Sequence, residues 1–209
     1  MEAQEKSLPK HRKTWVSALT VGVAGMVTAL LFSLAFLMAR PPVATKLSAA
    51  TQDPCAASQK FVCYSRYFQK VTTNESPTKA FNAMRTLSAN STFVRSQCHQ
   101  LSHNVGHAAF KKYGTLAKAY TMGDNYCWSG YYHGVTESAV GSMTKAQIRS
   151  QINGICAELA ARARYSADHF TCSHGLGHGL FSVENDDLFV ALKSCDILVD
   201  GWERTSCYG

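Results

Sequence analysis

The chain has 209 residues, 46% of them hydrophobic, and a formal net charge of +7. Residues 1–40 hold five basic and two acidic residues, a charge of +3, and residues 41–209 hold 16 basic and 12 acidic residues, a charge of +4 without a basic cluster. This distribution gives no support for nucleic-acid binding. Residues 55–209 are enough for one domain with a single core.

The first strong feature is a run of 26 residues without a charge, from Thr14 to Ala39. As a helix at 1.5 Å per residue it would measure about 39 Å, which exceeds the roughly 30 Å hydrocarbon core of a bilayer. The alternative is a cleavable signal peptide, but the apolar part of such a peptide has only about 7–15 residues. We therefore expect an uncleaved transmembrane helix at 14–39, behind a basic tail at 1–13.

The flanks of this run predict its orientation. Four basic residues lie shortly before it and two follow it closely. The positive-inside rule then places the N-terminus in the cytoplasm and the C-terminal domain in a periplasm, a lumen or the extracellular space. Residues 40–54, rich in small and polar residues, are expected to form a stalk.

All eight cysteines follow the predicted anchor. An even number of cysteines in an exported domain indicates disulfides. Cys55 and Cys63 are the one local pair that the spacing suggests, and the other pairings stay open. The alternative interpretation is that cysteine thiolates bind a metal.

Helical patterns dominate residues 55–209. Ser76-Pro77 is typical of a helix start. Thr144 and Gln147 form a capping box, and the apolar residues after them recur at i, i+4, i+7 and i+11, which predicts one helix to about Arg164. Another helix is expected from Asp186-Asp187. The predicted fold class is therefore all-α, with six or seven short helices in a disulfide-stapled bundle or short helical repeat.

An octapeptide of the pattern H-x-x-G-H-x-x-F occurs twice, at 103–110 and 174–181. Similar helical residues follow each copy, so we expect two related helical hairpins in a pseudo-twofold arrangement. After Cys127 the first unit continues through Tyr131-Tyr132, whereas the second stops at Gly209. This difference predicts a chain truncated at its C-terminus.

Histidines four residues apart lie on one face of a helix, and neutral imidazole binds transition metals such as zinc, copper and iron. We therefore predict a metal site in which the four octapeptide imidazoles converge, with ring nitrogens roughly 3–4 Å apart. Carboxylates are scarce nearby, which argues against a di-iron carboxylate centre and favours a histidine-dominated mononuclear site or haem-like ligation. The predicted donors are His103, His107, His174 and His178, with His99, His133 and Glu137 as further candidates.

Small residues spaced four apart, such as Gly130 with Gly134 and Gly175 with Gly179, predict close helix crossings. If the glycines break the second octapeptide into a loop, its helical spacing loses its meaning. His169 is expected to be a hydrogen-bonded core residue, and Trp128, Tyr131 and Tyr132 core or interface residues.

The alternative function is a non-catalytic interaction domain, in which the histidines are packing residues and aromatic side chains meet a protein partner at the membrane surface. No H-E-x-x-H, G-x-S-x-G, Walker or C-x-x-C-H motif occurs in the chain. The sequence thus predicts no reaction, and the expected role of the metal is structural or redox.

Overall fold

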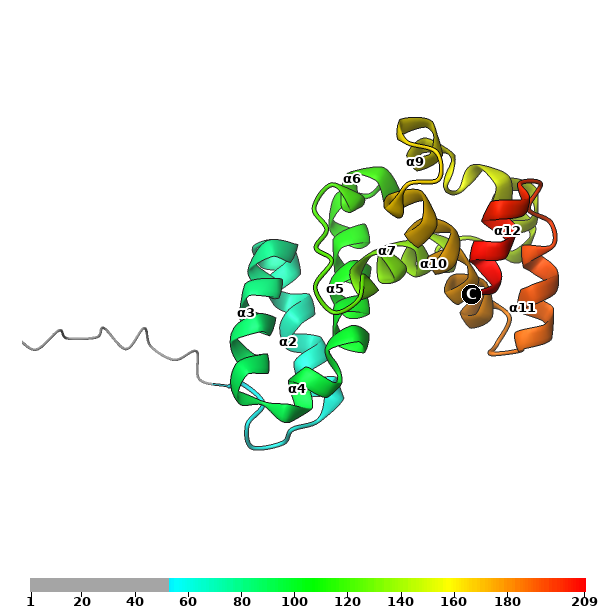
Figure 1. Ribbon diagram of the computed structural model, residues 1–209. Helices are drawn as coiled ribbons and strands as arrows, with labels where there is room; N and C mark the ends of the chain where they lie inside the picture. The colour runs from blue at the N-terminus through cyan, green and yellow to red at the C-terminus, as the bar shows by residue number, and fades with distance from the viewer. Residues whose placement is uncertain (1–52) are drawn as a thin grey trace, which may run out of the picture. The chain divides into compact units, whose positions relative to one another are not determined.

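A computed structural model of the protein describes residues 53–209, which are helical without any strand (Figure 1). This confirms the all-α class, with more helices than expected. The helices are α2 (Phe61–Asn74), α3 (Pro77–Asn90), α4 (Thr92–Ser96), α5 (Cys98–Tyr113), α6 (Leu116–Tyr120), α7 (Gly130–Gly141), α8 (Lys145–Gln151), the 3₁₀ turn η1 (Ile152–Gly154), α9 (Ala157–Arg162), α10 (Ala167–Val183), α11 (Leu188–Cys195) and α12 (Gly201–Tyr208).

The predicted tail, the predicted anchor and nearly all of the predicted stalk lie outside the described residues. Within residues 53–209, no helix combines the length and the apolar character needed to cross a bilayer.

Several helices begin at side chains that cap them. Ser76 accepts a hydrogen bond from the backbone N–H of Lys79, directly before α3. At α8, both hydrogen bonds of the Thr144 capping box are present. Asp187 caps α11. Each cap satisfies a backbone N–H that the helix itself leaves unpaired, so these predicted starts are confirmed.

The predicted helix from Thr144 to Arg164 is in fact three pieces, α8, η1 and α9. The break falls at Asn153-Gly154, two residues of low helix propensity. The Asn153 side chain donates to the Ile197 carbonyl at 3.3 Å and accepts from the Val199 N–H at 2.8 Å. These contacts tie the turn to the segment between α11 and α12.

All eight cysteines form disulfides, and no cysteine among residues 53–209 is free. The predicted local pair Cys55–Cys63 is confirmed. The other three disulfides are Cys98–Cys127, Cys156–Cys172 and Cys195–Cys207. With every sulfur paired, no thiolate is left to bind a metal.

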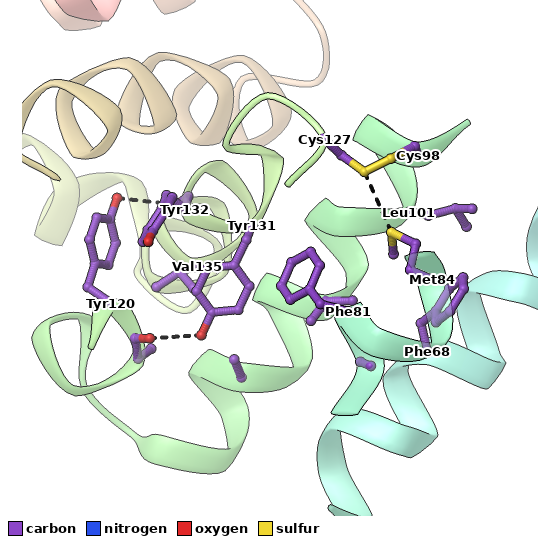
Figure 2. Close-up of a cluster of buried hydrophobic side chains, with 14 of the residues drawn as sticks. Phe68, Phe81, Met84, Cys98, Leu101, Tyr120, Cys127, Tyr131, Tyr132 and Val135 are labelled. Carbon is purple, nitrogen blue, oxygen red and sulfur yellow. Dashed lines mark hydrogen bonds between the residues drawn. A yellow bond between two sulfur atoms is a disulfide. The ribbon is translucent and has the colours of Figure 1, made fainter. Parts of the chain in front are cut away.

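The buried apolar residues form two clusters. One lies among α2, α3, α5, α6 and the start of α7, where the Met84 sulfur lies 3.7 Å from Cys127 Sγ of the Cys98–Cys127 disulfide (Figure 2). Tyr131 and Tyr132 are buried in this cluster, which confirms them as core residues. The other lies among the end of α7, α8, α10, α11 and α12. Helix α7 therefore contributes to both clusters.

Helix α7 lies between α5 and α10 and meets both at small residues (Figure 1). A Cβ atom added at Gly134 would lie 2.1 Å from the His103 carbonyl oxygen, and one at Gly106 would lie 2.1 Å from the Tyr131 carbonyl oxygen. On the other side of α7, a Cβ at Gly175 would lie 3.0 Å from the Thr136 side chain. The predicted close crossings are thus present, and α10 remains helical through its glycines.

Candidate metal centre

Five histidines from three helices gather where α7 crosses α5 and α10. Their ligand nitrogens form two groups of three, each within 4.8 Å of one another. The α5 triad is His99, His103 and His133, and the α10 triad is His133, His174 and His178. His133, on the central helix, belongs to both.

The octapeptides do not contribute to these triads in the same way. The second supplies both of its histidines, His174 and His178. In the first, only His103 joins a triad, and its partner is His99, one helical turn earlier. His107 instead directs Nε2 to the Glu137 carboxylate at 2.7 Å. The expected convergence of the four octapeptide histidines is therefore not what the structure shows.

The physical reason lies in which neighbour each helix meets. Gly106, inside the first octapeptide, packs on the α7 backbone. The matching glycine of the second, Gly177, packs on the Cys207 carbonyl of α12 instead. The glycine at this position therefore faces α7 in the first copy and α12 in the second, and the histidine pairs that meet over α7 are offset by one turn.

The neighbouring oxygen atoms favour one tautomer for each neutral ring of the α5 pair. Nδ1 of His99 lies 2.9 Å from the Cys127 carbonyl oxygen, and Nδ1 of His103 lies 2.9 Å from Oε1 of Glu137. Both oxygens only accept, so in neutral rings both Nδ1 atoms carry the proton and donate it. The two Nε2 atoms then present lone pairs to each other, 3.1 Å apart.

A separation of 3.1 Å suits two ligands of one metal ion. Metal–nitrogen bonds of about 2.0–2.1 Å place neighbouring ligands about 2.9 Å apart at a right angle and about 3.4 Å apart at the tetrahedral angle. Two facing lone pairs repel each other unless a proton or a metal ion lies between them. The α5 pair therefore has both the spacing and the tautomers of a metal-binding pair.

Glu137 is the carboxylate that orients this half of the site. Burial alone would raise its pKa, but hydrogen bonds from His103 and His107 outweigh burial and hold the pKa well below its usual value. Its side chain is only 17% exposed. Glu137 is therefore a partly buried anion that accepts hydrogen bonds from histidines, as the carboxylates beside metal-binding imidazoles commonly do.

The α10 pair has the same spacing with fewer partners. Nε2 of His174 lies 3.2 Å from Nε2 of His178. Nδ1 of His178 is 3.8 Å from Glu137, too far for a hydrogen bond. Nδ1 of His174 is buried without a hydrogen-bond partner among the described residues. The Ser206 backbone acts to raise the pKa of His174, but burial has the larger effect. Burial lowers the pKa of both rings.

His133 is the shared donor. The residue is 7% exposed, and its Nδ1 is buried without a hydrogen-bond partner in the part of the chain that the structure describes. Burial, and then the neighbouring imidazoles, lower its pKa to about 3. His133 is thus a neutral ring, available as a ligand, at physiological pH.

One element of the site has no signal in the sequence, the Cys127 carbonyl. Cys127, Trp128 and Ser129 all have positive φ angles, between 54° and 64°, a conformation that non-glycine residues rarely adopt. This turn precedes α7 and is bonded to α5 by the Cys98–Cys127 disulfide.

Trp128 is 77% exposed, so it is not a core residue.

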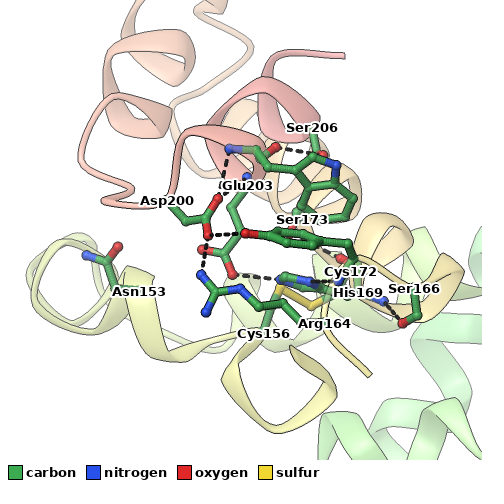
Figure 3. A network of polar contacts seen from close by, with 12 residues as sticks. Asn153, Cys156, Arg164, Ser166, His169, Cys172, Ser173, Asp200, Glu203 and Ser206 are labelled. Atoms are coloured by element: carbon green, nitrogen blue, oxygen red, sulfur yellow. Dashed lines mark hydrogen bonds and ion pairs between the residues drawn. A yellow bond between two sulfur atoms is a disulfide. The ribbon is translucent and has the colours of Figure 1, made fainter. Parts of the chain in front are cut away.

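His169 shows what a packing histidine looks like in the same domain (Figure 3). It is fully buried, its Nε2 lies 2.7 Å from Glu203, and its Nδ1 accepts the Tyr165 N–H at 3.0 Å. Both nitrogens are satisfied. The prediction of a hydrogen-bonded core residue is confirmed.

Comparison of the chain with known protein families, with characterised proteins and with solved structures finds no match.

Proposed function

We propose that the five histidines bind a first-row transition-metal ion, with the α5 triad as the more completely prepared site. The observation that carries the proposal is the pair of Nε2 atoms of His99 and His103, 3.1 Å apart, with each Nδ1 atom 2.9 Å from an oxygen acceptor. In this proposal Glu137 orients the ligands, and His107 holds Glu137 instead of binding the ion.

The alternative, that these histidines are packing residues, accounts less well for their contacts. A packing histidine satisfies its nitrogens within the protein, as His169 does. In the cluster, by contrast, Nδ1 of His133 and of His174 are buried without partners among the described residues. Packed cores rarely leave buried polar atoms unpaired, so these two rings do not have the contacts of packing histidines.

The donors favour zinc, copper or iron. Neutral imidazoles suit these ions, whereas magnesium and calcium prefer oxygen ligands. The cluster lies between two apolar cores on helices that cross at glycines, so a structural role, joining α5, α7 and α10, follows directly. With copper or iron the same ligands would support a redox role.

We further propose that the domain is exported and tied to a membrane by residues 14–39. Support comes from the uncharged run itself and from the pairing of all eight cysteines, since disulfides persist in oxidising compartments.

The proposal is tested by metal analysis of the full chain, purified without a polyhistidine tag and titrated with Zn²⁺, Cu²⁺ and Fe²⁺ after chelation. We expect at least one ion per chain and a rise in melting temperature on binding. His103→Ala should weaken binding at least about tenfold. The matched comparison is His107→Ala, which removes an imidazole of the same helix that contacts Glu137 instead of the ion, so it should weaken binding much less than His103→Ala does. A wild-type chain that binds none of the three ions would overturn the proposal.

A second candidate function, the interaction domain, rests on the large aromatic residues at the surface. Trp128 and Phe189 are 77% and 75% exposed. Substituting both by serine should abolish capture of a partner protein while leaving the fold and metal binding intact. Unchanged capture would remove this second function.

A further inference from the structure

A pocket of about 280 Å³ adjoins the α10 triad. The rings of His174 and His178 form part of its wall, and α11 and α12, joined by the Cys195–Cys207 disulfide, form the remainder. Within the described part of the chain, no Lys, Arg, Asp or Glu side chain lines it. Its other main side chains are Phe181, Leu188, Leu192 and Tyr208.

The α10 triad is also the more open of the two. The His178 side chain is 41% exposed, against 8% for His103. Metal sites that only support a fold are closed by four protein ligands, whereas sites that act on a substrate keep three protein ligands and one exchangeable position. Three imidazoles beside a pocket match the second arrangement.

We infer that an ion held by the α10 triad takes an exchangeable ligand from this pocket, namely a small, mainly apolar molecule with one nitrogen or oxygen donor. The inference rests on the metal binding proposed above. The donor would complete the coordination of the ion, and the apolar body would lie against Phe181 and Leu188. The volume is near the lower end for ligand pockets, and the apolar side chains of the wall suit an apolar body.

Two probes with the same donor test this inference on the full chain loaded with Co²⁺, whose visible spectrum reports its ligands. Imidazole supplies the donor alone, and 4-phenylimidazole adds an apolar ring. We expect 4-phenylimidazole to change the spectrum at a concentration at least about tenfold lower, because its ring is buried in the pocket. His178→Ala should remove this change.

Two neighbouring surface residues of α11 provide matched variants. Leu188 lines the pocket and is 54% exposed, whereas Phe189 does not line it and is 75% exposed. Leu188→Glu should abolish the preference for 4-phenylimidazole, and Phe189→Glu should preserve it. Because both side chains are already at the surface, neither change is expected to prevent folding.

The outcomes separate the two proposals. If Co²⁺ binds but both probes act at the same concentration, or if the two α11 variants behave alike, the pocket inference is wrong while metal binding stands. If no Co²⁺ spectrum develops and none of the ions binds, both proposals are wrong.

Discussion

The two histidine pairs that face α7 have the same spacing but different surroundings. The Nε2 atoms are 3.1 Å apart in the α5 pair and 3.2 Å apart in the α10 pair. Both Nδ1 atoms of the α5 pair meet an oxygen acceptor, whereas neither Nδ1 atom of the α10 pair has a hydrogen bond among the described residues. Helical spacing thus places the donors, and the contacts behind the rings distinguish an enclosed site from an open one.

The two helix crossings also differ, and the α5 side is again the more tightly enclosed. At Gly134, α7 lies against the α5 backbone, which cannot move aside without shifting a whole helix. At Gly179, on the α10 side, the atoms nearest to an added Cβ all belong to the Val140 side chain, and the closest would lie 2.9 Å away. The α5 half is therefore the more rigid, and the α10 half is where we expect adjustment.

The largest effect is expected from a methyl group at the tighter crossing. Gly134→Ala places Cβ 2.1 Å from the His103 carbonyl oxygen, so we expect a loss of about 3 kcal/mol or more in the free energy of unfolding. In Gly175→Ala the closest contact is 3.0 Å, and the gain in helix propensity opposes it, so the change should stay within about 1 kcal/mol. Urea unfolding measures the free energy of unfolding of both variants. Equal losses of stability would contradict the proposed difference between the two helix crossings.

The next-largest effect is expected from a change at Glu137, because this carboxylate contacts the α5 triad more closely than the α10 triad. Glu137 accepts from His103 at 2.9 Å but lies 3.8 Å from His178. Glu137→Gln should therefore weaken metal binding at the α5 triad about 10- to 100-fold, and much less at the α10 triad. Calorimetric titration, repeated in the backgrounds His99→Ala and His174→Ala, measures each triad separately. An equal loss in both backgrounds would mean that Glu137 does not favour the α5 triad.

The effect of a single pH unit is the smallest, and it concerns the shared ring, His133. The folded protein holds the pKa of His133 at about 3, below its ordinary value of 6.5, because the ring is buried. Below pH 6.5 the unfolded chain therefore binds a proton that the folded chain does not. His133 therefore does not lower the stability of the metal-free protein above pH 6.5, and it lowers that stability as the pH drops towards 3, by at most about 1.4 kcal/mol per pH unit.

Chemical unfolding of the metal-free chain between about pH 7 and pH 4 measures this slope. His133→Gln has no titratable ring at the position and should show a shallower slope. If both proteins lose stability equally, His133 is not the group responsible.

Much of the fold is predictable because its signals are local. The caps at Ser76 and Thr144 and the short Cys55–Cys63 loop each depend on a few neighbouring residues. The break at Asn153 is only partly local, because the low helix propensity of Asn153-Gly154 is visible in the sequence but the contacts that stabilise the turn come from Ile197 and Val199, 44 and 46 residues later.

In the metal centre, too, the features with a local signal could be predicted and those that depend on distant contacts could not. Every histidine of the cluster is among the predicted donors, because helical spacing identifies residues on one face. The alignment of the octapeptides, however, favours His107 over His99. That choice is decided by which helix each octapeptide meets, and by a backbone carbonyl at Cys127 that has no residue-type signature.

The missing side chain at Gly134 has a consequence for the choice of ion. With the α7 and α5 backbones in direct contact, the distance between His133 and the α5 pair is fixed by main-chain atoms, not by side chains that can adapt. The α5 triad should then tolerate little variation in bond length or angle. Ions that share similar affinities for imidazole would be distinguished there by the coordination geometry each prefers, so that a glycine without any ligand atom acts as the selectivity element of the site.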